Sequence, residues 1–388
     1  MNWETKSLGE LCDFQGGSQP PKSNFIYEPR EGYIRFLQIR DFGSENNHTY
    51  IPITKKNKTC NADDIMIGRY GASVGKILRG KSGAYNVALM KATPVTNLID
   101  KNFFWYYLNS NFFQDDLRNV ASRSAQDGFS KDDIYSFQVP LPPLSIQRKI
   151  VTTLDAIFAE INKATVATEA NIVNSEALFQ SYLTEIFERD SKDWKEVKLN
   201  QVSEYFNGLT YSPKDVSDTG IIVLRSSNIQ NDKLVFDDIV RVNLNVKEKI
   251  IVRDGDILMC SRNGSQRLVG KTATIMNLDE SMTFGTFMMI IRGKLNPFLE
   301  WFFKSNYFKK QIAGGENTMI NQITRYMLDD VVLNVPPSEE LESIIDVLSN
   351  LFRESRKLQS MYRNKSLELN VMKRSILEKA FRGELVTE

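Results

Sequence analysis

A pair of prolines followed by a long helical pattern occurs twice in this chain, and this repeat constrains the fold more than any other feature. The first copy begins at Pro142-Pro143 and the second at Pro336-Pro337. At the same offset of 194 residues, Leu154 coincides with Leu348. Proline cannot continue a strand or helix but is tolerated where a helix begins, so each pair predicts the end of a module and the start of a helix. The chain therefore contains two copies of one plan.

The repeat extends through both halves. Each half opens on a tryptophan, Trp3 or Trp194, and Gly17 then matches Gly208 at an offset of 191. We expect these glycines to mark a turn that both halves share.

Two further matches concern polar loops. A glycine-rich loop pairs Arg69 with Arg262, with two extra residues in the second copy, and Asp132-Asp133 pairs with Asp329-Asp330. An acidic pair next to a helix start is typical of capping, which we favour over a nuclease carboxylate cluster.

Each half predicts a mixed module followed by one long helix. Short β-type runs such as Ile257–Met259 alternate with glycine-rich turns, and too few helical patterns lie between them for βαβ units throughout. The aromatic stretch Phe103–Phe113 is expected to form a core helix rather than a base-stacking platform. We expect an α/β (α+β) fold with an internal pseudo-twofold repeat. Its parts are module 1–142, helix 143–188, module 189–337 and helix 338–388.

The two helical segments share a heptad frame. The frame places Ile157 and Leu178 in the core of the first helix, and Leu351 and Leu358 in the core of the second. Asn171 and Ser175 near the middle of the first frame, and Lys365 in the second, predict a polar interruption. Such helices could dimerise the protein or pair with each other, and two of them in one chain favour the second arrangement.

Composition excludes several kinds of site. Lys and Arg total 49 against 48 Asp and Glu, so a surface for a polyanion must come from local segregation of charge. Three cysteines and one histidine are too few for a disulfide framework, a zinc site or a histidine-based catalytic triad. With no signal sequence or membrane-length apolar run, we expect a reducing, cytoplasmic location and no membrane contact.

Over essentially its whole length the chain resembles the DNA-specificity subunits of type I restriction-modification systems. The residues that carry the resemblance are Val139–Val151, the opening Trp194–Leu199 and the closing Ala380–Leu385. The second junction departs from the pattern, because Leu341 replaces the glutamine found at Gln147. The resemblance implies two target-recognition domains, each reading half of a split DNA sequence. It also implies an antiparallel helix pair, a coiled coil that fixes the gap between the half-sites.

The resemblance further implies that the chain has no catalytic activity or cofactor. Its partners would be double-stranded DNA, two adenine-N6 methyltransferase subunits that hold the S-adenosylmethionine site, and translocase-endonuclease subunits. The sequence agrees, because it lacks the Asp/Asn-Pro-Pro-aromatic tetrapeptide of adenine methyltransferases and a Walker A motif. The alternatives are a single-chain methyltransferase or nuclease with duplicated domains, and a coiled-coil scaffold that does not bind DNA.

Three kinds of loop in each half are expected to contact DNA. They are the shared turn, the glycine-rich basic loop and the polar segment before each acidic pair. Arginine and lysine would neutralise phosphates, and asparagine, glutamine and arginine would read bases. Solvated hairpins and unconstrained loops remain the alternatives. The expected contacts are Gln15, Ser18, Arg69, Tyr70, Ser73, Lys76, Arg123, Gln126 and Lys131 in the first half, and Asn207, Tyr211, Arg262, Asn263, Gln266, Arg267, Lys271, Asn317, Asn321, Gln322 and Arg325 in the second.

Overall fold

The chain forms two compact units in a computed structural model that describes residues 3–43, 46, 48–122, 128–189, 191–313 and 321–385. One unit combines Met1–Thr168 with Asn364–Glu388, and the other is Glu169–Arg363. The long helices α5 (Leu144–Phe187) and α10 (Ser338–Phe381) each contribute to both units. Two α/β modules and two long helices confirm the predicted fold class. The boundaries at 142, 188 and 337 stay a prediction, because the compact units divide the helices.

The first module is built on two four-stranded sheets. One has the antiparallel order β2-β9-β6-β7, and the other has the order β4-β3-β8-β5 with β3 and β8 parallel. A short β1-β10 pair joins the start of the module to its end. The strands are β1 (Thr5–Ser7), β2 (Cys12–Gly16), β3 (Tyr33–Leu37), β4 (Tyr50–Pro52), β5 (Thr59–Cys60), β6 (Ile65–Gly68), β7 (Ile77–Leu78), β8 (Gly83–Tyr85), β9 (Leu89–Pro94) and β10 (Gln138–Pro140), and the helices are α1 (Leu8–Leu11), α2 (Lys101–Asn109), α3 (Asn111–Ala121) and α4 (Lys131–Ile134).

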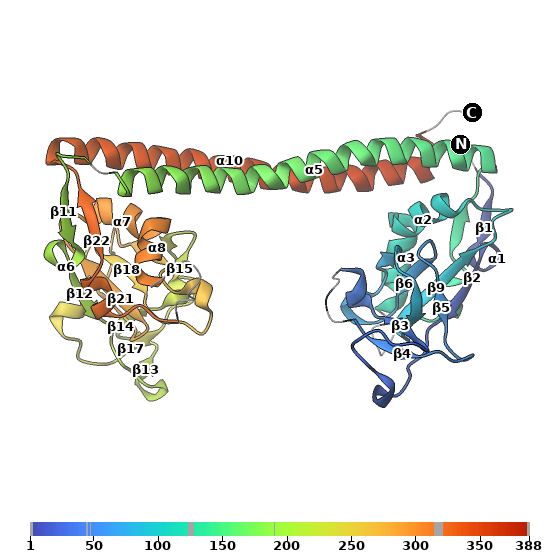
Figure 1. The fold of residues 1–388 in the computed structure, drawn as a ribbon, viewed down its shortest axis with the longest axis horizontal. Helices are drawn as coiled ribbons and strands as arrows, with labels where there is room; N and C mark the ends of the chain where they lie inside the picture. The colour runs from blue at the N-terminus through green and yellow to red at the C-terminus, as the bar shows by residue number, and fades with distance from the viewer. Residues whose placement is uncertain are drawn as a thin grey trace. The chain divides into compact units, whose positions relative to one another are not determined.

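The second module (Figure 1) repeats the first of these sheets strand for strand, whereas its second sheet gains an edge strand beyond β17 and lacks one beyond β20. Its sheets have the orders β12-β21-β18-β19 and β13-β17-β14-β20, again with one parallel pair, β14 and β20. A β15-β16 hairpin is added. The strands are β11 (Lys195–Lys198), β12 (Glu204–Asn207), β13 (Val216–Ser217), β14 (Ile221–Leu224), β15 (Ile229–Gln230), β16 (Lys233–Leu234), β17 (Arg241–Val242), β18 (Ile257–Cys260), β19 (Thr272–Thr274), β20 (Met282–Phe284), β21 (Met288–Arg292) and β22 (Val332–Val335), and the helices are α6 (Leu199–Val202), α7 (Asn296–Lys304), α8 (Asn306–Ala313) and α9 (Arg325–Asp329).

The aromatic helices α2 and α7 lie in the core of their units, as predicted, but the stretch Phe103–Phe113 is not one helix, because Ser110 divides it between α2 and α3. Phe103 and Tyr107 of α2 are buried, and so is Phe302 of α7. Each of these helices lies on the side of its module that faces the long helices (Figure 1). The end of α10 completes the first core, because the Phe381 ring centroid lies 5.0 Å from that of Phe103. The aromatic stretch therefore contributes to the hydrophobic core and is not exposed for stacking on bases.

Within each unit, α5 and α10 pair with each other. In the second unit, Ser355 Oγ donates to the Ser175 carbonyl oxygen (3.0 Å), and the Phe179 and Phe352 ring centroids lie 5.3 Å apart. As residue numbers rise from Phe352 to Ser355 in α10, those of their partners fall from Phe179 to Ser175 in α5. The pairing is thus antiparallel. Buried Ser355 and Gln359 make the helix pair polar near its middle, as predicted, whereas Lys365, the residue predicted for this role in the second helix, is exposed.

The heptad spacing of these helices is confirmed, but alternate core positions lie one residue later than predicted along α10, and so does Phe179 in α5. Leu178 is 72% exposed whereas Phe179 is 4% exposed. Phe179 is drawn inward because it packs on Trp301 of α7 as well as on α10, a third neighbour that a two-helix frame leaves out. The buried positions of the helix pair include Leu154, Ile161, Thr168 and Phe179 in α5, and Leu348, Ser355, Gln359 and Leu369 in α10.

Candidate nucleic-acid interface

Backbone hydrogen bonds fix how the glycine-rich loops of the two modules correspond. In the first module Gly75 N donates to the Gly68 carbonyl oxygen (2.9 Å), and in the second Gly270 N donates to that of Cys260 (2.8 Å). The loop therefore gains three residues in the second module, where the sequence predicted two.

The same register corrects the predicted match between two arginines. Arg69 and Ser261 each donate their backbone N–H to the neighbouring strand's carbonyl at 2.9 Å, so Arg69 corresponds to Ser261. Arg262 then occupies the place of Tyr70. The prediction was wrong by one residue because it followed the identity of the side chains, whereas strand pairing is set by the backbone.

A second loop lies beside the first in both modules. Tyr70 forms an isolated antiparallel bridge with Gly128, and Arg262 forms the equivalent bridge with Gln322. The glycine-rich loop and the segment before α4 or α9 thus meet, which brings together two of the three loops expected to contact DNA.

After this bridge the modules correspond at a constant offset of 194. Ser130 and Thr324 are the N-caps of α4 and α9, so Lys131 and Arg325 are equivalent first residues of a helix. Both are exposed cations, as the sequence predicted for contacts with DNA.

The predicted match of Asp132-Asp133 with Asp329-Asp330 is wrong by three residues. The first pair lies in the first turn of α4, whereas the second pair lies at the C-terminal end of α9. The Asp133 carboxylate accepts from Ser130 N (2.7 Å), and this bond holds the pKa of Asp133 below its usual range. This geometry bears out capping for Asp133. Among the residues described, no three His, Cys, Asp or Glu side chains converge on a metal site.

In the first module, two side chains predicted to contact DNA form hydrogen bonds with other residues of the module. Gln15 Oε1 accepts from the Tyr85 hydroxyl (3.2 Å), and Arg69 Nε donates to the Phe129 carbonyl (3.2 Å). The Arg69 guanidinium also lies 5.0 Å from the centroid of the Tyr70 ring. Arg69 therefore clamps the two loops together.

The other first-module candidates are more accessible. Lys76 and Tyr70 are exposed, and Ser18 and Ser73 are half-buried. Arg123 and Gln126 lie outside the described residues.

In the second module, one group of candidates surrounds two adjoining cavities. A cavity of about 600 Å³ is lined by Asn207, Gln322 and Arg325, and one of about 590 Å³ by Asn263, Gln266 and Asn321, with Arg262 in the wall of both. Gln266 Nε2 donates to Asn321 Oδ1 (2.6 Å) and Asn263 Nδ2 donates to Ser226 Oγ (3.0 Å), so two of these amides are held in place.

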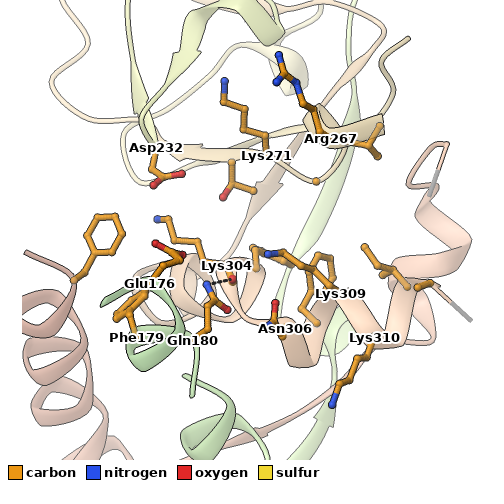
Figure 2. A pocket seen from close by; sticks show the side chains of 18 of the residues that line it. Glu176, Phe179, Gln180, Asp232, Arg267, Lys271, Lys304, Asn306, Lys309 and Lys310 are labelled. Carbon is orange, nitrogen blue, oxygen red and sulfur yellow. Dashed lines mark hydrogen bonds between the residues drawn. The ribbon is translucent and has the colours of Figure 1, made fainter. Parts of the chain in front are cut away.

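Other candidates of the second module lie elsewhere. Arg267 and Lys271 line a different cavity, of about 820 Å³, which Figure 2 shows between the module and Glu176 and Gln180 of α5. The Lys271 ammonium group donates to the Ile229 carbonyl. Tyr211 is half-buried beside Gly285. Asn317 lies outside the described residues.

This third cavity is strongly basic but partly neutralised. Lys304, Lys309 and Lys310 line it from α7 and α8 (Figure 2). Arg356 of α10 forms an ion pair with Asp232 at the tip of the β15-β16 hairpin (2.5 Å). The ion pair ties this hairpin to the long helix within the second unit.

Sequence reasoning missed two aromatic residues at the first pair of cavities. Phe287 is 56% exposed and Tyr326 is 84% exposed, and both line the 600 Å³ cavity. Phe287 precedes the apolar run of β21 and so resembles a strand residue in the sequence. Only the register, which places it beside Arg262, identifies it as part of the surface.

The thiol next to this surface is inert. Burial raises the pKa of Cys260, which ends β18 just before the loop. No helix in the part of the chain that the structure describes is both long and apolar enough to cross a membrane.

Comparison with known proteins extends the likeness to the whole chain. The type I restriction enzyme MjaVIII specificity subunit of Methanocaldococcus jannaschii is 22% identical over 380 residues, covering 90% of this chain and 86% of that protein. The EcoKI specificity subunit of Escherichia coli K12 is also 22% identical, over 100% of this chain and 90% of that protein.

Solved structures share the fold. A chain from a structure described as the basis of complex assembly and conformational transition of the type I R-M system aligns with a TM-score of 0.80 at 19% identity, over 99% of this chain and 98% of that chain. The HsdS subunit from Thermoanaerobacter tengcongensis aligns with a TM-score of 0.57, also at 19% identity, over 99% and 97%.

The family model described as "Type I restriction modification DNA specificity domain" matches residues 1–170 and again residues 191–368. These two matches cover the two modules and most of both long helices. The chain therefore belongs to the family of type I restriction-modification DNA specificity domains, and it contains that domain twice.

Proposed function

We propose that this chain is the DNA-specificity subunit of a type I restriction-modification complex and that it binds a bipartite, asymmetric DNA site. Residues 1–142 and 189–337 would each recognise one half-site, and the helices 143–188 and 338–388 would set the spacer between them. One observation carries the proposal: the bridged loops of the two modules have the same backbone register but different side chains. Arg262 stands where the first module has Tyr70, and Gln322 where it has Gly128.

Different side chains on equivalent backbones are what two different half-sites require. Exposed Lys76, Lys131 and Arg325 would neutralise phosphates, which gives affinity without sequence information. Amides such as Asn207 and Gln322 would read base edges from loops placed in the major groove.

The proposed partners are two adenine-N6 methyltransferase subunits, which translocase-endonuclease subunits would join. Both long helices expose large apolar side chains, including Leu178 and Val173 in the second unit and Leu367 and Val371 in the first. Exposed apolar groups of this kind are typical of protein interfaces, so we place methyltransferase docking on these surfaces. On this proposal the chain has no catalytic activity of its own.

Binding to DNA that contains the methylated motif of the host tests this function. The full-length chain should bind that DNA more tightly than scrambled DNA. Affinity should fall linearly on a log–log plot against salt, with a slope of about −0.9 per neutralised phosphate. Equal affinity for both DNAs would refute sequence recognition, and an absence of salt-dependent binding would favour a coiled-coil scaffold.

A second assay separates the proposal from a single-chain methyltransferase or nuclease. The purified chain is incubated with DNA and labelled S-adenosylmethionine, or with DNA and Mg²⁺. We expect methyl transfer only after a methyltransferase subunit is added, and cleavage only after translocase-endonuclease subunits are added as well. Methyl transfer or cleavage by the chain alone would favour the enzyme.

A further inference from the structure

Arg262 stands in the wall between the two adjoining cavities with its backbone fixed at two points. Its N–H donates to the Phe287 carbonyl (3.1 Å), and its residue forms the bridge with Gln322. Among the described residues, its guanidinium has no hydrogen-bond or ion-pair partner. A guanidinium on a rigid backbone, exposed and unpaired within the protein, is available to a ligand.

The ring of Phe287 restrains this guanidinium. The guanidinium carbon lies 5.7 Å from the ring centroid, within the range of a cation–π interaction. The backbone that carries the ring is well anchored, because the Phe287 carbonyl accepts from Ser261 N (2.9 Å), Arg262 N (3.1 Å) and Ser261 Oγ (3.0 Å). The pair therefore favours one orientation of the arginine before any ligand binds, by about 0.5–1 kcal/mol at an exposed site.

The chemistry of this orientation favours a base over a phosphate. A planar fork of donors matches the O6 and N7 acceptors of guanine in the major groove. The cavities on either side of Arg262 carry amides, Gln322 and Asn207 on one side and Gln266 on the other, which suit neighbouring base edges. Arg325 in the same wall supplies a second cation for a phosphate, which leaves Arg262 for a base edge.

The first module has no equivalent of this pair. Tyr70 takes the place of Arg262, and Ala88 takes the place of Phe287. Arg69 does lie against an aromatic ring, but its Nε is bonded to the Phe129 carbonyl. Any base that Arg262 reads therefore belongs to the half-site of the second module alone.

We propose that Arg262, oriented by Phe287, reads one guanine in the half-site recognised by the second module. This inference rests on the proposed DNA-binding function and names a base within it. Arg262 is the specificity-determining residue, and Phe287 is a positioning residue that acts through it.

Selection of DNA from a randomised double-stranded library tests the pair. The full-length chain, co-expressed with its methyltransferase subunits, is compared with R262K, R262A, F287A and F287Y. Both Arg262 variants should lose the preference for guanine at one position by about 5- to 150-fold, because a good bidentate contact discriminates by about that factor. F287A should weaken the preference at the same position, and F287Y should keep it. The other half-site should be unchanged in all four.

R267A is the matched control. Arg267 is exposed in the same loop but lines the separate 820 Å³ cavity beside α5. It would contribute charge without reading a base, so its loss should weaken binding to all sequences about equally. Thermal unfolding of each variant should match the parent, because the substituted side chains are exposed. A parent half-site without guanine, or an unchanged guanine preference in R262K and R262A, would overturn the inference while leaving the proposed function standing. A parent chain that selects no sequence at all would overturn both.

Discussion

Insertion of seven residues into each long helix is expected to lengthen the preferred DNA spacer by about three base pairs. The insertions follow Thr168 in α5 and Arg363 in α10, where the two compact units meet along each helix. Each adds one heptad with an apolar pair at its core positions. The helices then keep their 3.5-residue pattern, so the flanking core positions stay matched.

The magnitude follows from helix geometry. Seven residues at 1.5 Å each extend a helix by about 10.5 Å, and base pairs are stacked about 3.4 Å apart along DNA. The DNA would also turn by about 100° over three base pairs, given about 10.5 base pairs per turn. Total affinity is therefore expected to fall even as the preferred spacer lengthens.

The assay measures binding to a series of DNAs in which the two half-sites of the parent motif are separated by successively longer spacers. The parent and the double-insertion variant should differ by about three base pairs in the spacer that binds best. A variant with the insertion in α5 alone is the control, because its added heptad has no counterpart in α10, and it should lose a defined preference. An unchanged best spacer in the double-insertion variant would refute the idea that the helices set the distance.

Three further predictions concern stability and reactivity. R292M leaves the Asp256 carboxylate, only 2% exposed and bonded to Arg292 Nη2 at 2.6 Å, without its partner, so thermal or urea unfolding should show a loss of about 3–5 kcal/mol. D133N removes the carboxylate that accepts from Ser130 N. Because the folded-state pKa of Asp133 is lowered, this carboxylate contributes to stability above the unfolded pKa of about 3.9, and the contribution is lost as pH falls through the folded pKa. The melting temperatures of the variant and the parent should therefore converge in acid. Burial raises the pKa of Cys60 to about 11, so a thiol reagent at pH 8 should label it only as the protein unfolds, and labelling at the same rate in native and unfolded protein would contradict the burial.

The sequence predicted the architecture well because the repeat makes each half a check on the other. The aromatic core of α2 and α7, the two long helices and their polar middle were all expected from apolar spacing. The spacing of apolar residues indicates which side of a helix or strand is buried, and a single sequence is enough to read it. The fold class required no more than this.

Errors of register arose where side-chain identity and backbone position disagree. Matching the arginines made Arg69 equivalent to Arg262, although the backbone hydrogen bonds show that Arg69 occupies the same position in its module as Ser261 in the second. In the helices, Leu178 was chosen over Phe179 because a two-helix frame cannot include the contact of Phe179 with Trp301. Both errors come from neighbours that lie far away in the sequence.

The sequence predicted which loops form the candidate site but not how their side chains are arranged in it. Two of the polar, basic segments expected to contact DNA meet in each module, but the sequence could not separate arginines that clamp the fold from those left available. Arg69 and Arg262 look alike in sequence and differ only in what their guanidinium groups touch. Phe287 was missed because exposure of a strand residue depends on its register.

The contribution of α10 to the first core places a demand on biosynthesis. Phe381 packs against Phe103, yet it is made more than two hundred residues after Thr168, the last residue of the first segment of that unit. At about 5–20 residues per second, the ribosome needs about 10–40 s to cover that stretch. During this interval the nascent first module has an open apolar cleft where α10 will lie, so holding factors that protect nascent chains should engage it there, before the second module is complete.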